Sequence, residues 1–335
     1  MTIDDISLRL AGLSGGSALF LHNKITGQYI NYTNKGVDLT GNNPITPLTP
    51  FRIASNTKTF TAAAILRLWE MQQLELDHSI RQYLPPNINQ LLSSRHGTDQ
   101  ITLRHLLNHS SGMFDHADQR FIAKCLAAPQ HVWTREEQLQ LYIQKTVPYI
   151  APGQQFIYSD TGYLLLGSII ETVSGLPLAK AIRTLLNFNE IGLKTAWWEI
   201  LEPQPVEAFT RAKQYLGQYD VSALHPSMDL FGGGGLVMTT QQLVLFMQSL
   251  FEGHIFDNRQ TLTEMLSVGQ HEGAENYRLG LFANNFNGIT VYSHLGFWGS
   301  AVYYSPEQQL CIAGFVDQRE HRASLVQLIE QLIVE

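Results

Sequence analysis

The sequence is poor in cysteine and in charged residues, and these shortages exclude several classes of protein. Only two of its 335 residues are cysteine, Cys125 and Cys311. Two are too few for a disulfide framework, and they lie too far apart for a zinc knuckle, so we interpret both as buried thiols. Lysine and arginine form no run, and the formal net charge is −7. A nucleic-acid-binding surface normally carries a basic patch, so that function is disfavoured.

Long apolar runs are also missing from the sequence. No segment reaches the roughly 18 apolar residues that a membrane-spanning helix needs, so we expect no membrane span. The N-terminus lacks the basic and apolar regions of a signal peptide, which favours a cytoplasmic location for the chain as written. A periplasmic or secreted protein whose export signal had been removed would show the same pattern. Nothing in the sequence specifies an oligomeric state.

The composition that remains is that of an ordinary globular protein, with 44% hydrophobic and 15% charged residues. This length allows one large domain or two interleaved lobes. Alternating apolar and polar residues predict a hairpin near the N-terminus, and short β-rich segments predict strands near the C-terminus. The expected strands are 17–22, 28–33, 277–282, 289–294, 301–305 and 310–316, and a last helix is expected over 322–334.

The residues between these strands are predicted to be mainly helical. Residues 57–74 are apolar nearly all round, which indicates a central, buried helix. Thr134 is followed three residues later by a glutamate, the pattern of a capping box that begins a helix. Another helix is expected to begin at Asp160 or Thr161 and to end at Gly175.

The order strands, helices, strands, helix predicts an α+β fold. Strands from both ends of the chain would complete one antiparallel sheet flanked by helices, with an all-helical lobe inserted between them. We expect residues 1–75 and 230–335 to form the sheet lobe and residues 76–229 to form the mainly helical lobe. A cleft between the two lobes is the expected place for an active site.

One short motif in the sequence carries chemistry of its own. Ser55-Asn-Thr-Lys58 is the only Ser-x-x-Lys in the chain. If Ser55 opens the buried helix, Lys58 lies one turn further on the same face, and the helix N-terminus favours negative charge near the hydroxyl. Burial would lower the pKa of Lys58 from about 10.4 to about 7, so that it could act as a base. Alone the motif is weak, because a helix cap followed by a solvated lysine looks the same.

Further motifs make the sequence resemble the serine β-lactamase and penicillin-binding protein superfamily. Phe-Arg-Ile-Ala-Ser-Asn-Thr-Lys at 51–58 is similar to its nucleophile motif, and the other similar segments are Leu-Leu-Asn-His-Ser-Ser-Gly at 106–112, Pro-Gly-Gln-Gln-Phe-Ile-Tyr-Ser-Asp at 152–160, Gly-Gly-Leu at 234–236 with two threonines at 239–240, and His-Leu-Gly at 294–296. They follow the family's order and spacing. The branch that fits contains class C β-lactamases, D-alanyl-D-alanine carboxypeptidases, D-aminopeptidases and esterases.

The resemblance implies a role for each of several residues. Ser55 would attack a carbonyl carbon, while Lys58 and Tyr158 would take and return the proton. The backbone N–H groups of Ser55 and Phe297 would bind the oxyanion, with Gly296 preceding Phe297 at the end of a sheet-edge strand. The implied reaction needs no metal and no organic cofactor, and its partner is a small-molecule or peptide substrate.

The sequence departs from the family pattern at two positions expected to contact substrate. Asp160 stands where the family has an asparagine, and His294 stands where β-lactamases have a lysine. Both changes remove positive potential, because an unperturbed histidine is mostly neutral near pH 7. We therefore expect neutral esters, neutral amides or substrates with a free amine to be favoured over penicillins. Alternatively, Asp160 points away as a helix cap or pairs with Lys58. If a substrate carries a carboxylate, titration of His294 should raise its KM between pH 5.5 and 7.5.

The sequence thus predicts a serine hydrolase that forms an acyl-enzyme from an amide or ester. A D-Ala-D-Ala carboxypeptidase, D-aminopeptidase or esterase is expected; the alternatives are a true β-lactamase and a penicillin-binding sensor that stays acylated. A metallohydrolase is a weaker alternative. His105 and His109 are spaced like ligands on a zinc helix, with Asp115 and His116 nearby, but the segment lacks the glutamate of His-Glu-x-x-His.

Overall fold

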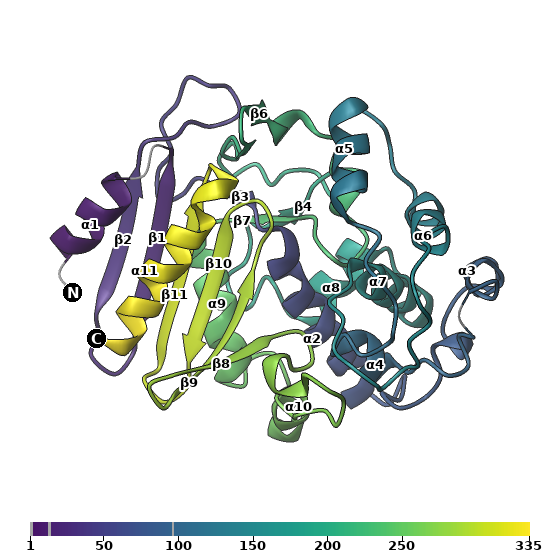
Figure 1. Ribbon diagram of the computed structural model, residues 1–335. Helices are drawn as coiled ribbons and strands as arrows, with labels where there is room; N and C mark the ends of the chain where they lie inside the picture. Colours follow the sequence, from purple (N-terminus) through teal and green to yellow (C-terminus); the bar gives the residue numbers. More distant parts are fainter. Residues whose placement is uncertain (1–2, 13–14, 96) are drawn as a thin grey trace.

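A six-stranded antiparallel sheet separates two hydrophobic cores in the computed structural model, which describes residues 3–12, 15–95 and 97–335 (Figure 1). In spatial order its strands are β2 (Tyr29–Asn34), β1 (Ser17–Asn23), β11 (Leu310–Val316), β10 (Ser300–Ser305), β9 (Ile289–Leu295) and β8 (Phe282–Phe286). Ser17 lies opposite Val316 in the β1–β11 ladder. Strands from the two ends of the chain therefore complete one sheet, as predicted.

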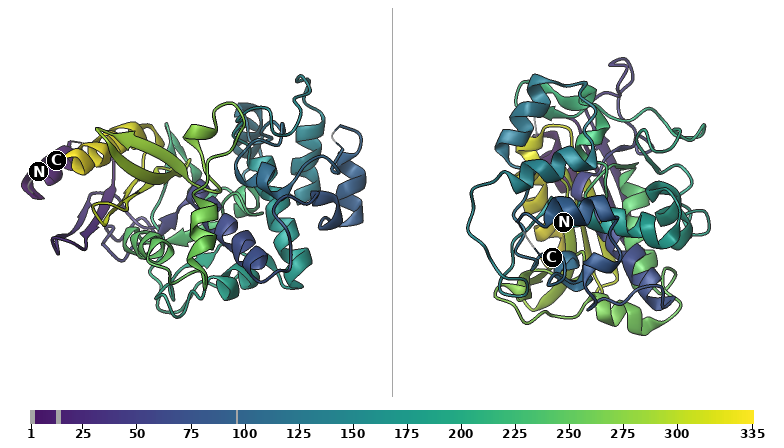
Figure 2. Two further views of the ribbon diagram at one scale, coloured as in Figure 1. Left: turned by 90° about the horizontal axis from the view of Figure 1, so that it is seen from below. Right: turned by 90° about the vertical axis from the view of Figure 1, so that its right-hand side faces the viewer.

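Alternate residues of β11 face different cores, as the period of a strand requires. Cys311, Ala313 and Phe315 belong to the core beneath α2 (Thr57–Glu70) and α9 (Thr240–Phe251). Ile312 and Val316 belong to the opposite core, under α1 (Ile3–Ala11) and α11 (Arg322–Val334). The sheet is thus flanked by helices on both faces (Figures 1 and 2).

The helices of the middle segment gather at one end of this sheet (Figure 1). They are α3 (Pro86–Leu92), α4 (Leu103–Leu107), α5 (Gln119–Ala127), α6 (Arg135–Ile143), α7 (Asp160–Ser174) and α8 (Leu178–Leu185), with α10 (Arg259–Met265) further along the chain. Short strands β3 (Phe51–Arg52), β7 (Leu236–Met238) and β4 (Trp197–Trp198) form a second sheet, and β5 (Tyr215–Leu216) pairs with β6 (Tyr219–Asp220). In the described ranges no single helix is long and apolar enough to cross a membrane; α7 and α8 pass that test only as a pair bent by 76°.

The central helix α2 is buried nearly all round, which confirms the prediction from its composition. It ends at Glu70 rather than at residue 74, because Gln72 already has a positive φ of 58°. Helix α7 begins at Asp160 and ends before Gly175, whose φ of 68° forms a left-handed cap. The expected capping box at Thr134 is present at the start of α6.

The expected strand over 277–282 is wrong. The chain makes a tight turn there, in which the Arg278 N–H donates to the Leu281 carbonyl, and β8 begins only at Phe282. Gly280 has a φ of 92°, and a side chain on it would lie 2.3 Å from Cβ of Ala62 in α2. This glycine lets the turn approach the central helix, which a strand could not do.

Both cysteines are buried, as predicted. Cys125 lies in α5 and Cys311 in the middle of the sheet. Burial raises the pKa of the Cys125 thiol to about 12 and also raises that of Cys311. Both thiols therefore stay protonated over the ordinary range of pH.

Candidate active site

Ser55 lies in a strained turn that is tied to the large sheet. A single 3₁₀ turn, Ala54–Asn56, leads into α2, and Ala54 has a φ of 47°. This conformation costs an L-residue on the order of 1–2 kcal/mol and often marks a functional site. The Asn56 side-chain amide donates to the Ile53 carbonyl and to Ser300 Oγ, both at 2.8 Å. These bonds fix the turn against β10.

The structure brings Lys58 and Ser55 together, as the spacing predicts. Lys58 Nζ donates to Ser55 Oγ at 2.9 Å and to the Gly233 carbonyl at 3.0 Å. Its side chain is completely buried, and its ammonium group forms an ion pair with Asp160. Of the alternatives for Asp160, pairing with Lys58 is therefore the one observed, although its carboxylate remains 21% exposed and also lines the cavity.

The prediction that burial lowers the pKa of Lys58 is wrong. Burial does disfavour the ammonium form, but the carboxylate of Asp160, through its charge and its hydrogen bond, outweighs burial, so the pKa of Lys58 is raised above its ordinary value. The sequence argument included desolvation and left out the counter-ions. Lys58 is therefore a permanent cation near neutral pH.

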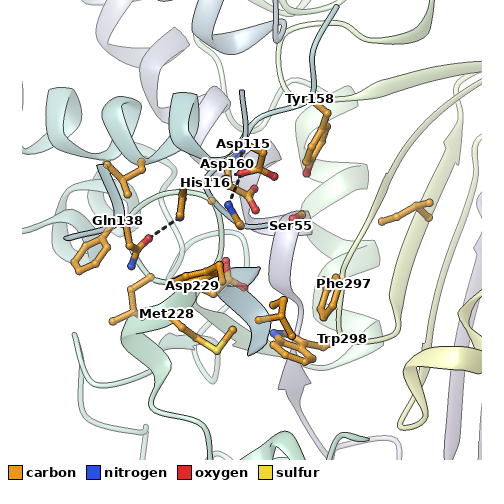
Figure 3. A pocket seen from close by; sticks show the side chains of 18 of the residues that line it. Ser55, Asp115, His116, Gln138, Tyr158, Asp160, Met228, Asp229, Phe297 and Trp298 are labelled. Carbon is orange, nitrogen blue, oxygen red and sulfur yellow. Dashed lines mark hydrogen bonds and ion pairs between the residues drawn. The ribbon is translucent and has the colours of Figure 1, made fainter. Parts of the chain in front are cut away.

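Tyr158 lies beside Ser55 and lines the same cavity, and its hydroxyl points toward the serine (Figure 3). Its ring centroid is 5.2 Å from Lys58 Nζ. Burial raises the pKa of Tyr158 to about 12, while Lys58 and hydrogen bonds with Ser55 and Lys58 oppose that rise. Tyr158, a hundred residues further along the chain than Lys58, thus meets Ser55 and Lys58 at the tip of α2.

A cavity of about 300 Å³ opens beside these residues (Figure 3). Much of its wall is apolar, including Phe121, Leu164, Phe231, Phe282, Phe297 and Trp298. His116 and Gln138 form part of the polar wall and are hydrogen-bonded to each other at 2.9 Å. Arg322, from the start of α11, is a cation on this wall and donates to the Gly296 carbonyl at 3.0 Å. The cavity suits a ligand that is mainly apolar and carries a few polar groups.

Three carboxylates line this cavity: Asp160 was expected there, Asp115 was considered only for the zinc alternative, and Asp229 was missed. Asp115 accepts the backbone N–H of Asp160 at 3.1 Å, and Asp229 packs so close to Gly234 that a side chain there would lie 2.2 Å from its Oδ1. Burial, reinforced by the charge of Asp160, raises the pKa of both Asp115 and Asp229 to about 7. The only signal in the sequence was the place of Asp229 just before a run of glycines, which a carboxylate can approach closely.

The end of β9 forms another part of the wall. Phe297 lines the cavity together with Ser55. A side chain on Gly296 would lie 2.3 Å from the Ile53 carbonyl, so only glycine lets this strand end approach the turn before Ser55. Phe297 therefore lies near the turn that carries Ser55, and the oxyanion role of its N–H stays a prediction.

His294 was expected to contact substrate, but it is buried behind the cavity wall. Its side chain is completely buried, and its Nε2 lies 3.0 Å from the Tyr277 hydroxyl. Burial, aided by the charge of Lys58, lowers the pKa of His294 to about 3. The expected titration of His294 between pH 5.5 and 7.5 is therefore wrong, because the ring stays neutral throughout that range.

The two histidines of the zinc alternative do not share a helix. Helix α4 ends at Leu107, and His109 follows it with a φ of 60°. His109 Nδ1 accepts the backbone N–H of Ser159, whereas His105 Nδ1 accepts that of Thr102, both at 3.2 Å. No group of three or more His, Cys, Asp or Glu side chains arranged to hold a metal ion occurs in the part of the chain that the structure describes.

Solved structures share this architecture. The D-amino acid amidase from Ochrobactrum anthropi SV3, in complex with L-phenylalanine amide, is 25% identical with a TM-score of 0.75, over 94% of this chain and 89% of that one. The octameric penicillin-binding protein homologue from Pyrococcus abyssi is 23% identical with a TM-score of 0.77, over 97% and 76%. The fold is therefore the β-lactamase/transpeptidase-like α+β fold, as the motifs predict.

Sequence comparison assigns the family. A protein of Escherichia coli (strain K12) with the provisional name D-alanyl-D-alanine carboxypeptidase is 25% identical over 299 residues, which cover 79% of this chain and 68% of the relative. A Salmonella typhi protein with the same provisional name is 24% identical over 301 residues, with the same coverage. The sequence matches the Beta-lactamase family over residues 12–331, so this chain belongs to that family of serine hydrolases.

Proposed function

We propose that this protein hydrolyses an amide or ester bond through an acyl-enzyme on Ser55. The observation that carries the proposal is the 2.9 Å hydrogen bond from Lys58 Nζ to Ser55 Oγ, with Tyr158 next to both residues. An activated serine needs a charged group and a proton acceptor within immediate reach. The strained turn and the nearby end of β9 are consistent with the same role.

The charge of Lys58 gives Lys58 and Tyr158 different roles. Tyr158 rests as a phenol, because burial raises its pKa to about 12, and the ammonium of Lys58 lowers the cost of forming the phenolate, which is the reactive minority form. That phenolate takes the proton from Ser55 Oγ, which attacks the carbonyl carbon. Tyr158 then returns the proton to the departing amine or alcohol, and a water molecule releases the acyl group by the same steps. The N–H groups of Ser55 and Phe297 hold the oxyanion.

The charges around the cavity favour a substrate with a free amine. Above about pH 7, where Asp115 and Asp229 are ionised, these two carboxylates and Asp160 outnumber the buried ammonium of Lys58, so the potential in this part of the cavity favours a cation. Apolar walls would hold a hydrophobic side chain. We therefore propose an amide or ester of an apolar amino acid with its amino group free, the kind of ligand bound in the amidase structure.

A second candidate is a D-Ala-D-Ala carboxypeptidase, the activity in the provisional name of the E. coli relative. Arg322 favours it, because this cation on the cavity wall could attract a peptide C-terminal carboxylate. Its guanidinium is 3.0 Å from the Gly296 carbonyl and retains further N–H groups for a ligand.

A hydrolysis panel tests both candidates. The substrates are D- and L-phenylalanine amide, a neutral p-nitrophenyl ester, a D-Ala-D-Ala peptide and nitrocefin, each with wild type and Ser55→Ala. We expect the amino acid amides or the ester to have the highest kcat/KM and Ser55→Ala to lose hydrolysis by at least about 10³-fold. Activity that persists in Ser55→Ala would refute the acyl-enzyme, and a preference for the D-Ala-D-Ala peptide would select the second candidate.

Intact-mass measurement separates an enzyme from a sensor. A fluorophosphonate should add one adduct to wild type and none to Ser55→Ala. After a short incubation with the best substrate of the panel, an enzyme returns to its unmodified mass, whereas a sensor keeps the acyl group. We expect the unmodified mass.

A further inference from the structure

A chain of buried hydrogen bonds runs behind Tyr158, from α4 to the end of β9. Tyr163, in α7, donates its hydroxyl to the Leu107 carbonyl at 2.8 Å. Tyr277 Oη lies 3.0 Å from His294 Nε2, and the Tyr277 hydroxyl interacts with that of Tyr163, whose pKa it lowers against the effect of burial. His294 Nδ1 lies 3.0 Å from the backbone N–H of Leu295. The side chains of Tyr163, Tyr277 and His294 are all completely buried.

The direction of each bond in this chain follows from its fixed end. The Leu107 carbonyl can only accept, so Tyr163 donates to it and must accept from Tyr277. Tyr277 has then used its one proton and must accept from His294 Nε2. The ring is therefore the neutral tautomer with its proton on Nε2, and its bare Nδ1 accepts the N–H of Leu295.

A contact of 3.2 Å between His294 Nδ1 and the Leu295 carbonyl would suit the other tautomer. That tautomer would require Tyr277 to donate to His294, and Tyr163 would lose the only proton offered to it within the chain. The Leu295 N–H decides between the two, because it can only donate and therefore requires a bare Nδ1. The low pKa of His294, caused first by burial and then by Lys58, agrees with a neutral ring.

We propose that His294 is a positioning residue that fixes the end of β9 relative to Tyr158, and that it does not bind substrate. This inference rests on the proposed function of Ser55. Leu295, which His294 holds through its N–H, lines the cavity, and Phe297, the expected oxyanion donor, follows two residues later. The ring centroids of Tyr277 and His294 each lie 6.4 Å from that of Tyr158. The chain thus connects the part of the wall that carries the base to the part that carries the oxyanion donor.

Tyr277→Phe tests the proposal, because it breaks the chain and leaves His294 in place. We expect kcat to fall about 10- to 100-fold while KM stays within about twofold, since a small misplacement of a donor has effects of this size. Tyr303→Phe is the matched control: this tyrosine is also buried, its hydroxyl is bonded to Glu330 on the other face of the sheet, and its loss should leave kcat unchanged. Circular dichroism and thermal melting verify that both variants fold.

Two conservative variants of His294 separate positioning from binding. His294→Gln places an amide donor near the Nε2 position, and His294→Asn places an acceptor near the Nδ1 position. Each should recover part of the kcat that His294→Ala loses. Two p-nitrophenyl esters that differ only by a carboxylate should show the same fold-loss of kcat/KM in His294→Ala, because the His294 ring touches neither ester. A selective rise in KM for the anionic ester, together with wild-type kcat in Tyr277→Phe, would overturn the proposal.

Failure of the proposed function would be distinguishable from failure of this inference. If the wild type hydrolysed none of the panel, the rate of Ser55 labelling by a fluorophosphonate would replace kcat as the readout. Tyr277→Phe should slow this labelling by about 10-fold or more, since the same donors bind the phosphonyl oxygen. Equal labelling rates in Tyr277→Phe, Tyr303→Phe and wild type would refute the positioning role.

Discussion

Lys58 and His294 are both completely buried beside the same cavity, and yet one is charged and the other neutral. Lys58, at the tip of α2, has Asp160 as a counter-ion, and its pKa is raised. His294, at the end of β9, has a tyrosine hydroxyl and a backbone N–H as partners, and its pKa falls to about 3. The comparison shows that burial alone does not decide the charge of a group. The partner decides it.

The largest expected effect comes from replacing Tyr158, the proposed base beside the charged Lys58. Tyr158→Phe removes the hydroxyl that would take the proton of Ser55, so kcat should fall about 10²- to 10⁴-fold. The KM should change little, because the ring remains in place. Steady-state kinetics with the best substrate of the panel measure both constants. A variant with more than a tenth of the wild-type kcat would shift the role of base away from Tyr158.

Asp160→Asn makes the region around Lys58 more like that around His294. Without its first counter-ion, the pKa of Lys58 should fall, because burial then has less opposing it. The cavity also loses a negative charge, so kcat/KM for nitrocefin should rise several-fold relative to that for a neutral ester. The folded state should lose about 2–3 kcal/mol, as a buried cation is left with fewer partners.

The measurement for Asp160→Asn is the ratio of the two kcat/KM values, together with the urea midpoint. Asp220→Asn serves as the control, because it removes a carboxylate on β6 that pairs with Lys213. An unchanged ratio in Asp160→Asn would mean that this carboxylate does not govern the preference among substrates.

Asp229→Asn tests whether another buried group beside the cavity is charged or neutral. The measurement is the pH dependence of stability. The pKa of Asp229 is raised to about 7, first by burial and then by Asp160, so the folded state holds this proton more tightly than the unfolded chain does. Its stabilising effect is complete below about pH 4 and is lost as the pH rises toward 7. The variant should therefore melt at nearly the wild-type temperature at pH 4 and several degrees above it at pH 8. Melting curves at both values provide the test.

The difference between variant and wild type isolates this one group. Buried neutral histidines such as His116, whose pKa burial lowers to about 4, make stability rise with pH below about 6.5. They contribute equally to both proteins and cancel. A variant that melts below wild type at pH 8 would mean that Asp229 has a net stabilising partner.

The smallest expected effect comes from the helix cap at Thr134. It shows how large an ordinary change in stability is in this protein. Thr134 accepts the Glu137 N–H at the start of α6, and Thr134→Ala should cost about 1 kcal/mol. Urea denaturation measures this loss, and kcat should be unaffected. A change in kcat would show that α6 influences the cavity, to which it contributes Gln138.

The features predicted best from the sequence are those that depend only on residues close together in the chain. Ser55 and Lys58 meet because one helical turn separates them, and residues 310–316 form β11 because alternation specifies a strand without reference to distant residues. The charge of Lys58 was predicted wrongly, although pairing with Asp160 was one of the alternatives, because nothing local to Lys58 indicates that this carboxylate, more than a hundred residues away, is its counter-ion. For the same reason the partners of His294 were hidden: Tyr277 lies in a turn where a strand was expected.

The buried cysteines also make this protein convenient for chemical modification. Only thiolates react readily with maleimides, and the raised pKa values of Cys125 and Cys311 keep both as thiols. A cysteine introduced at the fully exposed Val206 would carry a fluorophore at one defined position, with no need to replace either native residue.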